Sequence, residues 1–164
     1  MFSPSELNKV MRLDGKHNTV AHFRPEHLDR INFQWWDELA VKDPRVDYRK
    51  YLTEYAEAGT AWTGIGDGKV YACWGIVTMW TGVGEAWLTC SKDISRKALP
   101  MHRGAGLFME YAAKKMKLHR LQVLVRSDVV PLCRWIESLY FERESTLKKY
   151  GPDMSDSHLY VRFF

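Results

Sequence analysis

One feature constrains the fold more than any other: an apolar run at residues 121–125 that follows a strand-like and then a helix-like segment. Residues 85–90 are typical of a strand, and residues 107–117 have the spacing of an amphipathic helix. An almost continuously apolar run indicates an interior strand covered on both faces. Because strand–helix–strand connections to a parallel neighbour are right-handed, we predict a parallel βαβ unit in the second half of the chain.

The middle of the chain predicts an antiparallel meander. Residues 61–65, 69–80 and 85–90 have strand character, and glycine-rich turns separate them. Further strands are predicted at 18–23, 141–147 and 157–163, and helices at 5–11, from 24 through 39, at 48–58 and at 130–138. In the second of these helices, we expect Leu28, Ile31, Trp35 and Leu39 to face the core. A meander combined with a βαβ unit predicts a single α+β domain, residues 1–164, with one central mixed sheet.

Composition and charge exclude several classes of protein. The chain has 164 residues, 46% hydrophobic content and a net charge of +4, which indicates a globular domain and makes nucleic acid an unlikely partner. No segment has the length or flanks of a membrane anchor or secretory leader, so we expect no membrane partner and a cytoplasmic location. Cys73, Cys90 and Cys133 lie in apolar surroundings and are expected to be buried free thiols. No metal-ligand spacing occurs, so no metal site is predicted.

The segment before the predicted helix at 107 carries two glycines, Gly104 and Gly106, next to Arg103. Glycines let backbone approach a ligand closely, and a helix that begins after them presents unpaired N–H groups. With the charge of Arg103, this arrangement suits a phosphate or pyrophosphate. The alternative is that the two glycines serve packing or capping only.

Residues 101–106 read Met-His-Arg-Gly-Ala-Gly, which resembles the acyl-CoA loop pattern Gln/Arg-x-x-Gly-x-Gly/Ala of the GNAT family of acyl-CoA-dependent N-acyltransferases. Both glycine positions match, whereas Met101 stands where the family has Gln or Arg. Residues 118–123 and 135–141 are similar to the family's start of the fifth strand and end of the following helix. A narrower likeness, carried by residues 82–88, 147–153 and 159–162, is to phage-encoded GNAT-like proteins grouped with an internal virion protein.

The resemblance implies a splayed fourth and fifth strand with the pantetheine arm of acetyl-CoA, the co-substrate, between them. Backbone groups of Leu88, Thr89 and Cys90 would pair with the pantetheine amides like an added strand. The pyrophosphate would lie on the glycine segment; the residues implied there are Met101, His102, Arg103, Gly104, Ala105, Gly106 and Leu107. Asp128 would accept a hydrogen bond from pantetheine or cap the next helix.

For catalysis, the resemblance implies Glu85 as the general base that deprotonates the attacking amine. The family's usual general acid, a Tyr, is replaced here by Ile136. Tyr140 and Tyr150 are the candidate substitutes, and departure of the thiolate without an acid is the alternative.

The acceptor would be an amine of a protein or small molecule. The acceptor cleft would draw on Tyr150 and on Trp35, Trp36, Asp37 and Glu38, which predicts an aromatic, partly acidic wall and hence a cationic amine.

Two other functions stay open at this point. The first is a catalytically degenerate GNAT-fold phage protein that acts as a binding or virion-assembly factor, favoured by Met101 and Ile136. The second is a nucleic-acid binder, supported only by the mild positive charge. A homodimer is a further expectation for either active or degenerate forms.

Overall fold

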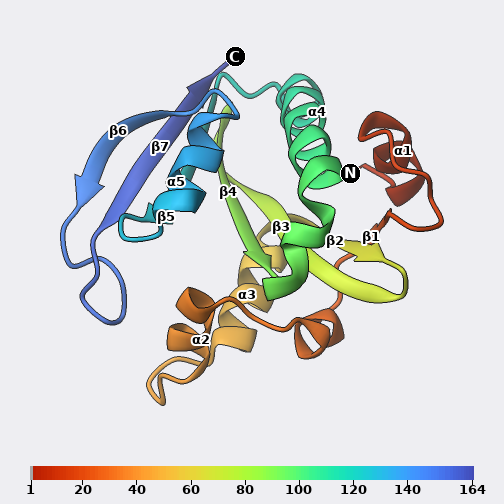
Figure 1. Ribbon diagram of the computed structural model, residues 1–164. Coiled ribbons are helices and arrows are strands. Elements are labelled where there is room, and N and C mark those ends of the chain that lie inside the picture. Colours follow the sequence, from red (N-terminus) through yellow and green to blue (C-terminus); the bar gives the residue numbers. More distant parts are fainter. Residues whose placement is uncertain (1) are drawn as a thin grey trace.

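The structure is a computed structural model that describes residues 2–164, which form one β-sheet flanked by helices (Figure 1). The strands are β1 (Thr19–His22), β2 (Gly59–Gly66), β3 (Lys69–Trp80), β4 (Val83–Cys90), β5 (Arg120–Arg126), β6 (Glu142–Leu147) and β7 (Ser157–Phe163). The α-helices are α1 (Pro4–Val10), α2 (Trp35–Val41), α3 (Tyr48–Glu57), α4 (Ala98–Met116) and α5 (Val130–Glu137). Two 3₁₀ helices are η1 (Pro25–Arg30) and η2 (Lys92–Lys97).

The strands form one mixed sheet in the order β1-β2-β3-β4-β5-β7-β6. Neighbouring strands are antiparallel, except for β4 and β5, which are parallel and joined through α4. The α+β class, the meander β2-β3-β4 and the βαβ unit predicted from the sequence are therefore confirmed.

Two hydrophobic clusters cover the two faces of the sheet. On one face, α1, α4 and α5 bury Leu7, Phe108 and Ile136 against strand residues that include the fully buried Trp62. On the other face, η1 and α3 contribute Leu28, Leu52 and Ala56, which pack with Trp87 of β4. Figure 1 shows α4 and α5 in front of the sheet and α3 behind it. The centre of the sheet is therefore enclosed from both sides.

The parallel pairing of β4 and β5 is short. Residues 83–85 pair with residues 120–122, and the last pair is Glu85 with Gln122. Beyond this pair, β4 stays on β3 as far as Cys90, while β5 stays on β7 as far as Arg126. The two strands diverge (Figure 1), so the sheet opens as a wedge whose apex is at Glu85 and Gln122.

The predicted start of the helix at residue 107 is wrong. Helix α4 begins at Ala98, directly after η2, whose first turn Ser91 caps by accepting from the Asp93 N–H. Gly104 and Gly106 are therefore interior helical residues. A Cβ on Gly104 would lie 2.9 Å from Met11 Cε, so this glycine allows close packing of α4 beside the end of α1. A packing contact between distant segments overrides the loop signal that glycines give in a sequence.

The continuous helix predicted from residue 24 through 39 is also wrong. The backbone adopts an extended conformation at Ile31, and Phe33 forms a β-bridge with Ser91. The helices η1 and α2 are therefore separate. Leu28 and Ile31 are buried as predicted, but Trp35 and Leu39 are 46% and 41% exposed. The next helix, α3, matches its prediction, with Asp47 as the N-cap.

The three cysteines are buried and unpaired, as predicted. Within residues 2–164, no helix is long and apolar enough to cross a bilayer. Nor does this part of the chain bring three His, Cys, Asp or Glu side chains together in a way that could hold a metal ion.

Gly75 of β3 lies where β3 is packed closely against its two neighbouring strands, β2 and β4. A Cβ there would lie 2.3 Å from the Thr60 carbonyl oxygen and 2.5 Å from Trp87 Nε1, and the carbonyl belongs to the paired strand. We expect Gly75→Ala to lower the free energy of unfolding by about 2 kcal/mol or more. Urea unfolding followed by circular dichroism measures the change.

Gly106→Ala is the matched control. The nearest atom to its Cβ is Leu139 Cδ2 at 3.8 Å, an ordinary contact. Alanine is favoured over glycine in a helix interior by about 1 kcal/mol, so this variant should be at least as stable as the wild type. Equal stability of the two variants would contradict the packing described for β3 and β4.

Candidate active site

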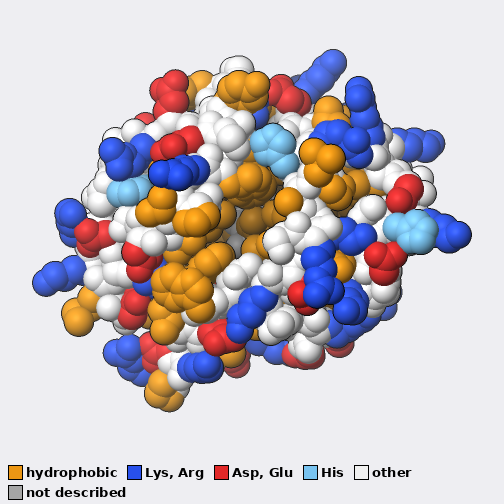
Figure 2. Space-filling model, in the orientation of Figure 1, with side chains coloured by type: hydrophobic (Ala, Val, Ile, Leu, Met, Phe, Trp, Pro, Cys, Tyr) orange, Lys and Arg blue, Asp and Glu red, His pale blue; other side chains and the backbone are white. Residues whose placement is uncertain are grey.

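A cavity of about 360 Å³ occupies the wedge between β4 and β5. Figure 2 shows a hollow on this face of the molecule rimmed mainly by hydrophobic side chains. Most of the helices and strands contribute to its walls, and it extends beyond the wedge to residues of β1, β2 and β3. Among the lining residues are Glu85 and Leu88 of β4, Val123 and Val125 of β5, Met101 and Ala105 of α4, Trp135 and Ile136 of α5, Tyr48, Tyr51 and Tyr55 of α3, and Tyr150 of the β6–β7 loop.

Glu85, a predicted catalytic residue, lies half-buried at the apex of the wedge. The Tyr55 hydroxyl donates to Glu85 Oε1, and Gln122 Nε2 donates to Glu85 Oε2 at 2.8 Å. Arg120 Nη2 donates in turn to Gln122 Oε1 at 3.3 Å, which fixes the orientation of that amide. The carboxylate is thus held from both sides while its edge borders the cavity.

A row of tyrosines runs along α3 beside this carboxylate. Tyr48, Tyr51 and Tyr55 are spaced by three and four residues, and successive rings stack with centroids 6.3 and 5.4 Å apart. Burial, followed by the nearby Tyr150 and Glu85, raises the pKa of Tyr51. Burial and the hydrogen bond to Glu85 raise the pKa of Tyr55. Tyr51, Tyr55, Tyr150 and Glu85 therefore form one cluster of interacting groups.

Asp37 lies behind this row, not in the cavity wall. It is 8% exposed and accepts hydrogen bonds from the Tyr48 hydroxyl at 2.7 Å and from Thr89 Oγ1 at 3.1 Å. It thereby joins α2, α3 and β4. Burial raises the pKa of Asp37 to about 6.

The other residues predicted for the acidic and aromatic acceptor wall also lie elsewhere. Glu38 forms ion pairs with Lys42 and Lys92. The exposed Trp35 stacks against the Arg126 guanidinium at 5.3 Å. Tyr150 is the residue of this predicted wall that lines the cavity.

The predicted cofactor residues of β4 lie along the open edge of the wedge. Leu88 lines the cavity, whereas the side chains of Thr89 and Cys90 are buried. Burial raises the pKa of the Cys90 thiol to about 12, which suits a structural role for this side chain. Beyond Glu85, the side of β4 that faces β5 pairs with no strand among residues 2–164, so its backbone groups are free to pair with an extended ligand.

The predicted glycine segment lies within α4. Met101 and Ala105 line the cavity, Gly104 is buried against Met11, and Arg103 donates to the Arg12 carbonyl at 3.0 Å. The other three residues of this segment do not line the cavity either; they are His102, Gly106 and Leu107. N–H groups beyond the first turn of a helix bond within the helix, so the segment does not offer the loop-and-helix-start geometry expected from the sequence.

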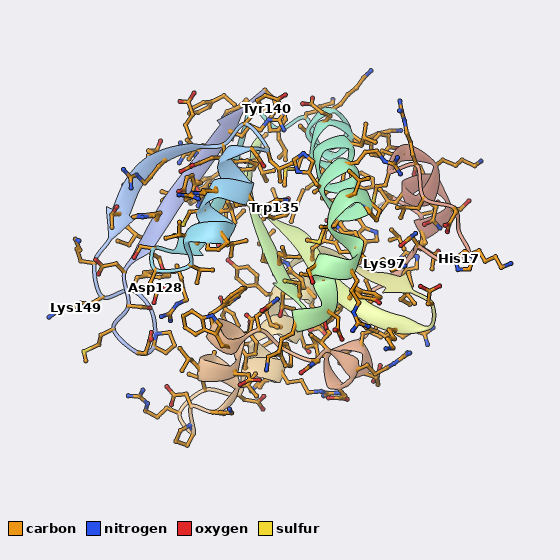
Figure 3. The ribbon with its side chains drawn as sticks, in the orientation of Figure 1. His17, Lys97, Asp128, Trp135, Tyr140 and Lys149 are labelled. Carbon is orange, nitrogen blue, oxygen red and sulfur yellow. The ribbon has the colours of Figure 1, made fainter. Side chains whose placement is uncertain are left out.

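Asp128 and Tyr140 lie away from the cavity. Arg126 Nε and Nη2 donate to Asp128 at 3.0 and 2.8 Å, and this guanidinium lowers the pKa of the carboxyl. The predicted cap is wrong, because Val129 is the N-cap of α5. Tyr140 is 79% exposed and stacks against Arg162 at 5.4 Å. Figure 3 shows Tyr140 and Asp128 on opposite sides of Trp135, which lines the cavity.

Sequence reasoning missed the two residues that hold Glu85. Tyr55 belongs to a helix face that the sequence marks as apolar, and nothing local distinguishes it from a core residue. Gln122 carries a usable signal, since it is the polar residue within the apolar run of β5. An interior polar side chain needs a partner, and here that partner is Glu85.

No protein-family model matches this chain. No curated protein matches it either. Solved structures do match it, and they include a GNAT-family acetyltransferase from Bacillus anthracis, with 17% identity, 90% of this chain and 95% of that chain covered, and a TM-score of 0.67. Ard1 from Thermoplasma volcanium matches with 12% identity, coverage of 90% and 97%, and a TM-score of 0.72.

A third match is RimL, a ribosomal alpha-N-protein acetyltransferase solved in complex with coenzyme A. It shares 11% identity over 90% of this chain and 94% of its own, with a TM-score of 0.65. Similarity at these identities shows the fold. The chain therefore has the fold of the GNAT acetyltransferases, and its own candidate site lies in the wedge between β4 and β5.

The buried Asp37 predicts a pH-dependent stability. Its pKa of about 6 in the folded protein exceeds its ordinary value of 3.8, so the folded state binds more protons between these pH values. The stabilisation from protonated Asp37 is complete below pH 4 and is lost as the pH rises through 6. The loss amounts to about 3 kcal/mol at most.

Asp37→Asn removes this titration and keeps a similar shape. The stability of the wild type relative to Asp37→Asn should therefore fall between pH 4 and pH 7. Urea unfolding of both proteins at pH 4, 5, 6 and 7 measures the difference. Parallel stability profiles would contradict the burial of a titrating carboxyl at this position.

Proposed function

We propose that this protein is an N-acyltransferase that moves an acetyl group from acetyl-CoA to an amine. The observation that carries the proposal is the cavity in the wedge, which places a hydrogen-bonded carboxylate, Glu85, at the apex and an unpaired strand edge alongside. Solved acetyltransferases of the same fold support it, and one of them was solved with coenzyme A.

The open edge of β4 suits the pantetheine arm. Amides of the arm would pair with backbone groups of Leu88, Thr89 and Cys90, as a peptide strand adds to a sheet. Apolar side chains of β5 and α5 would cover the arm from the other side. Of the segment from Met101 to Leu107, predicted for the nucleotide end, Met101 and Ala105 line the cavity, whereas its N–H groups bond within α4, so we assign no phosphate contact to it.

The reaction requires a neutral amine, which attacks the thioester carbonyl. Glu85 would accept the proton that the amine loses, while Tyr55 and Gln122 hold the carboxylate in place. Collapse of the adduct breaks the C–S bond and releases the thiolate of coenzyme A. Tyr150 lines the cavity and is our candidate to return a proton to that thiolate, whereas Tyr140 lies outside the cavity.

The finer expectations rest on the sequence alone and remain predictions. They are the relationship to phage-encoded virion-associated proteins, the cytoplasmic location and the homodimer. The degenerate binding or assembly role is the alternative outcome if the protein binds no acyl-CoA.

Binding of acetyl-CoA is the first test. At about 100 times the dissociation constant, a ligand that binds only the folded state adds about 2.7 kcal/mol of stability. We expect the unfolding midpoint to rise by roughly 5 °C or more at saturating acetyl-CoA. Adenosine 3′,5′-bisphosphate, which lacks the pantetheine arm, should bind at least about tenfold more weakly because it cannot pair with β4. No shift at millimolar acetyl-CoA would refute the proposal.

The role of Glu85 is tested by Glu85→Gln, which removes the base. Turnover, followed as release of free thiol from acetyl-CoA with a reactive amine, should fall by about 100-fold or more. The affinity for acetyl-CoA should change by less than about threefold, because the base is needed for the chemical step and not for binding of the cofactor. Glu26→Gln makes the same chemical change at an exposed position of η1 and should leave both quantities unchanged. Equal turnover of the two variants would exclude Glu85 as the base.

A further inference from the structure

The carboxylate at the apex of the wedge has no cation in contact with it among the described residues. The guanidinium of Arg120 is linked to it through the amide of Gln122 and is itself paired with Glu144. No ion pair among the described residues includes Glu85, and its two hydrogen bonds come from the neutral groups of Tyr55 and Gln122. A half-buried negative charge against apolar walls is poorly solvated, so a positive charge brought beside it is stabilised. The site is thus electrostatically incomplete without a cationic ligand.

Aromatic rings surround the same carboxylate. Tyr51 and Tyr55 stack along α3 with centroids 5.4 Å apart, and Tyr150 reaches the cavity from the β6–β7 loop. The face of a tyrosine ring attracts an ammonium group, more strongly where water is excluded. Tyr51 and Tyr150 are 49% and 57% exposed, so a ligand can reach their rings. The carboxylate and the nearby rings therefore provide two kinds of attraction for a single positive charge.

Near Glu85, the described lining of the cavity provides no corresponding site for a negative charge. Lys97 is its one basic lining residue among those the structure describes. Lys97 Nζ is already engaged, with Asp67 Oδ2 at 2.9 Å and the His17 carbonyl at 3.3 Å. Figure 3 shows Lys97 and His17 on the far side of α4 from Trp135. A carboxylate attached next to the amine would meet Glu85 and uncharged side chains, with no cation to balance it.

We propose that the acceptor is a primary amine on an apolar or aromatic carbon skeleton, with no anionic group beside the nitrogen. It binds as an ammonium against Glu85 between Tyr51, Tyr55 and Tyr150. The proposal rests on the proposed function and narrows its acceptor from amines in general to arylalkyl and alkyl amines, excluding free amino acids. Transfer of the ammonium proton to Glu85 then yields the neutral nucleophile.

Calorimetric titration of the protein saturated with coenzyme A tests this acceptor class without requiring turnover. 2-Phenylethylamine is the probe. L-Phenylalanine adds a carboxylate to it, and 2-phenylethanol removes its charge. We expect 2-phenylethylamine to bind at least about tenfold more tightly than either control, which corresponds to about 1.4 kcal/mol. No binding of 2-phenylethylamine, or binding of phenylalanine or phenylethanol with equal affinity, would overturn the proposal.

Variants of the loop tyrosine separate its ring from its hydroxyl. Tyr150→Leu should weaken binding of 2-phenylethylamine by about five- to tenfold, whereas Tyr150→Phe should keep it within about threefold, since the ring face is retained. Met154→Ala, a change on the same loop at a 71% exposed side chain, is the control and should have no effect. Equal affinity of Tyr150→Leu and the wild type would remove Tyr150 from the binding site.

Titration of acetyl-CoA into the wild type separates a failure of the proposed function from a failure of the proposed acceptor class. If acetyl-CoA does not bind to the wild type, the proposed function fails. If acetyl-CoA binds and 2-phenylethylamine does not, the acyltransferase function stands and this acceptor class is wrong.

Discussion

The structure depends on the short parallel pairing between β4 and β5, which ends at Glu85 and Gln122. Three residue pairs join the antiparallel meander on one side of the sheet to β5, β7 and β6 on the other. Had the pairing continued, the sheet would be closed and the cavity absent. Because it stops, both the free strand edge and the space beside it arise at one place, and the side chain at the last pair becomes the acidic group of a site whose described lining holds no other carboxylate.

The sequence predicted the fold well where local patterns coincide with tertiary packing. Strand β3 has the predicted bounds because its two ends are marked by turns, and β5 was found because both of its faces are covered. The start of α4 was missed because Gly104 was interpreted as a flexible residue. It is in fact the contact point for Met11, more than 90 residues away, and no local pattern encodes that contact.

The candidate site was predictable in part for a related reason. Glu85 was identified because the family resemblance implies a general base at the start of the fourth strand. Its partner Tyr55 lies 30 residues earlier on a helix whose apolar face is indistinguishable from a core face. Asp37 was expected in the cavity wall because the family resemblance implies an acceptor cleft built in part from the first two helices. Its burial follows from two hydroxyl partners, Tyr48 and Thr89, that the fold brings to it.

The shared carboxylate of Asp37 has a mechanical consequence. Thr89 belongs to the strand edge along which an acyl donor would lie, and Tyr48 begins the helix that carries the acceptor wall. A shift of β4 that widens the wedge would pull on Asp37 and hence on α3. Binding of the donor would then change the affinity for the acceptor, and binding of the acceptor would change the affinity for the donor by the same factor, since both sites share this linkage.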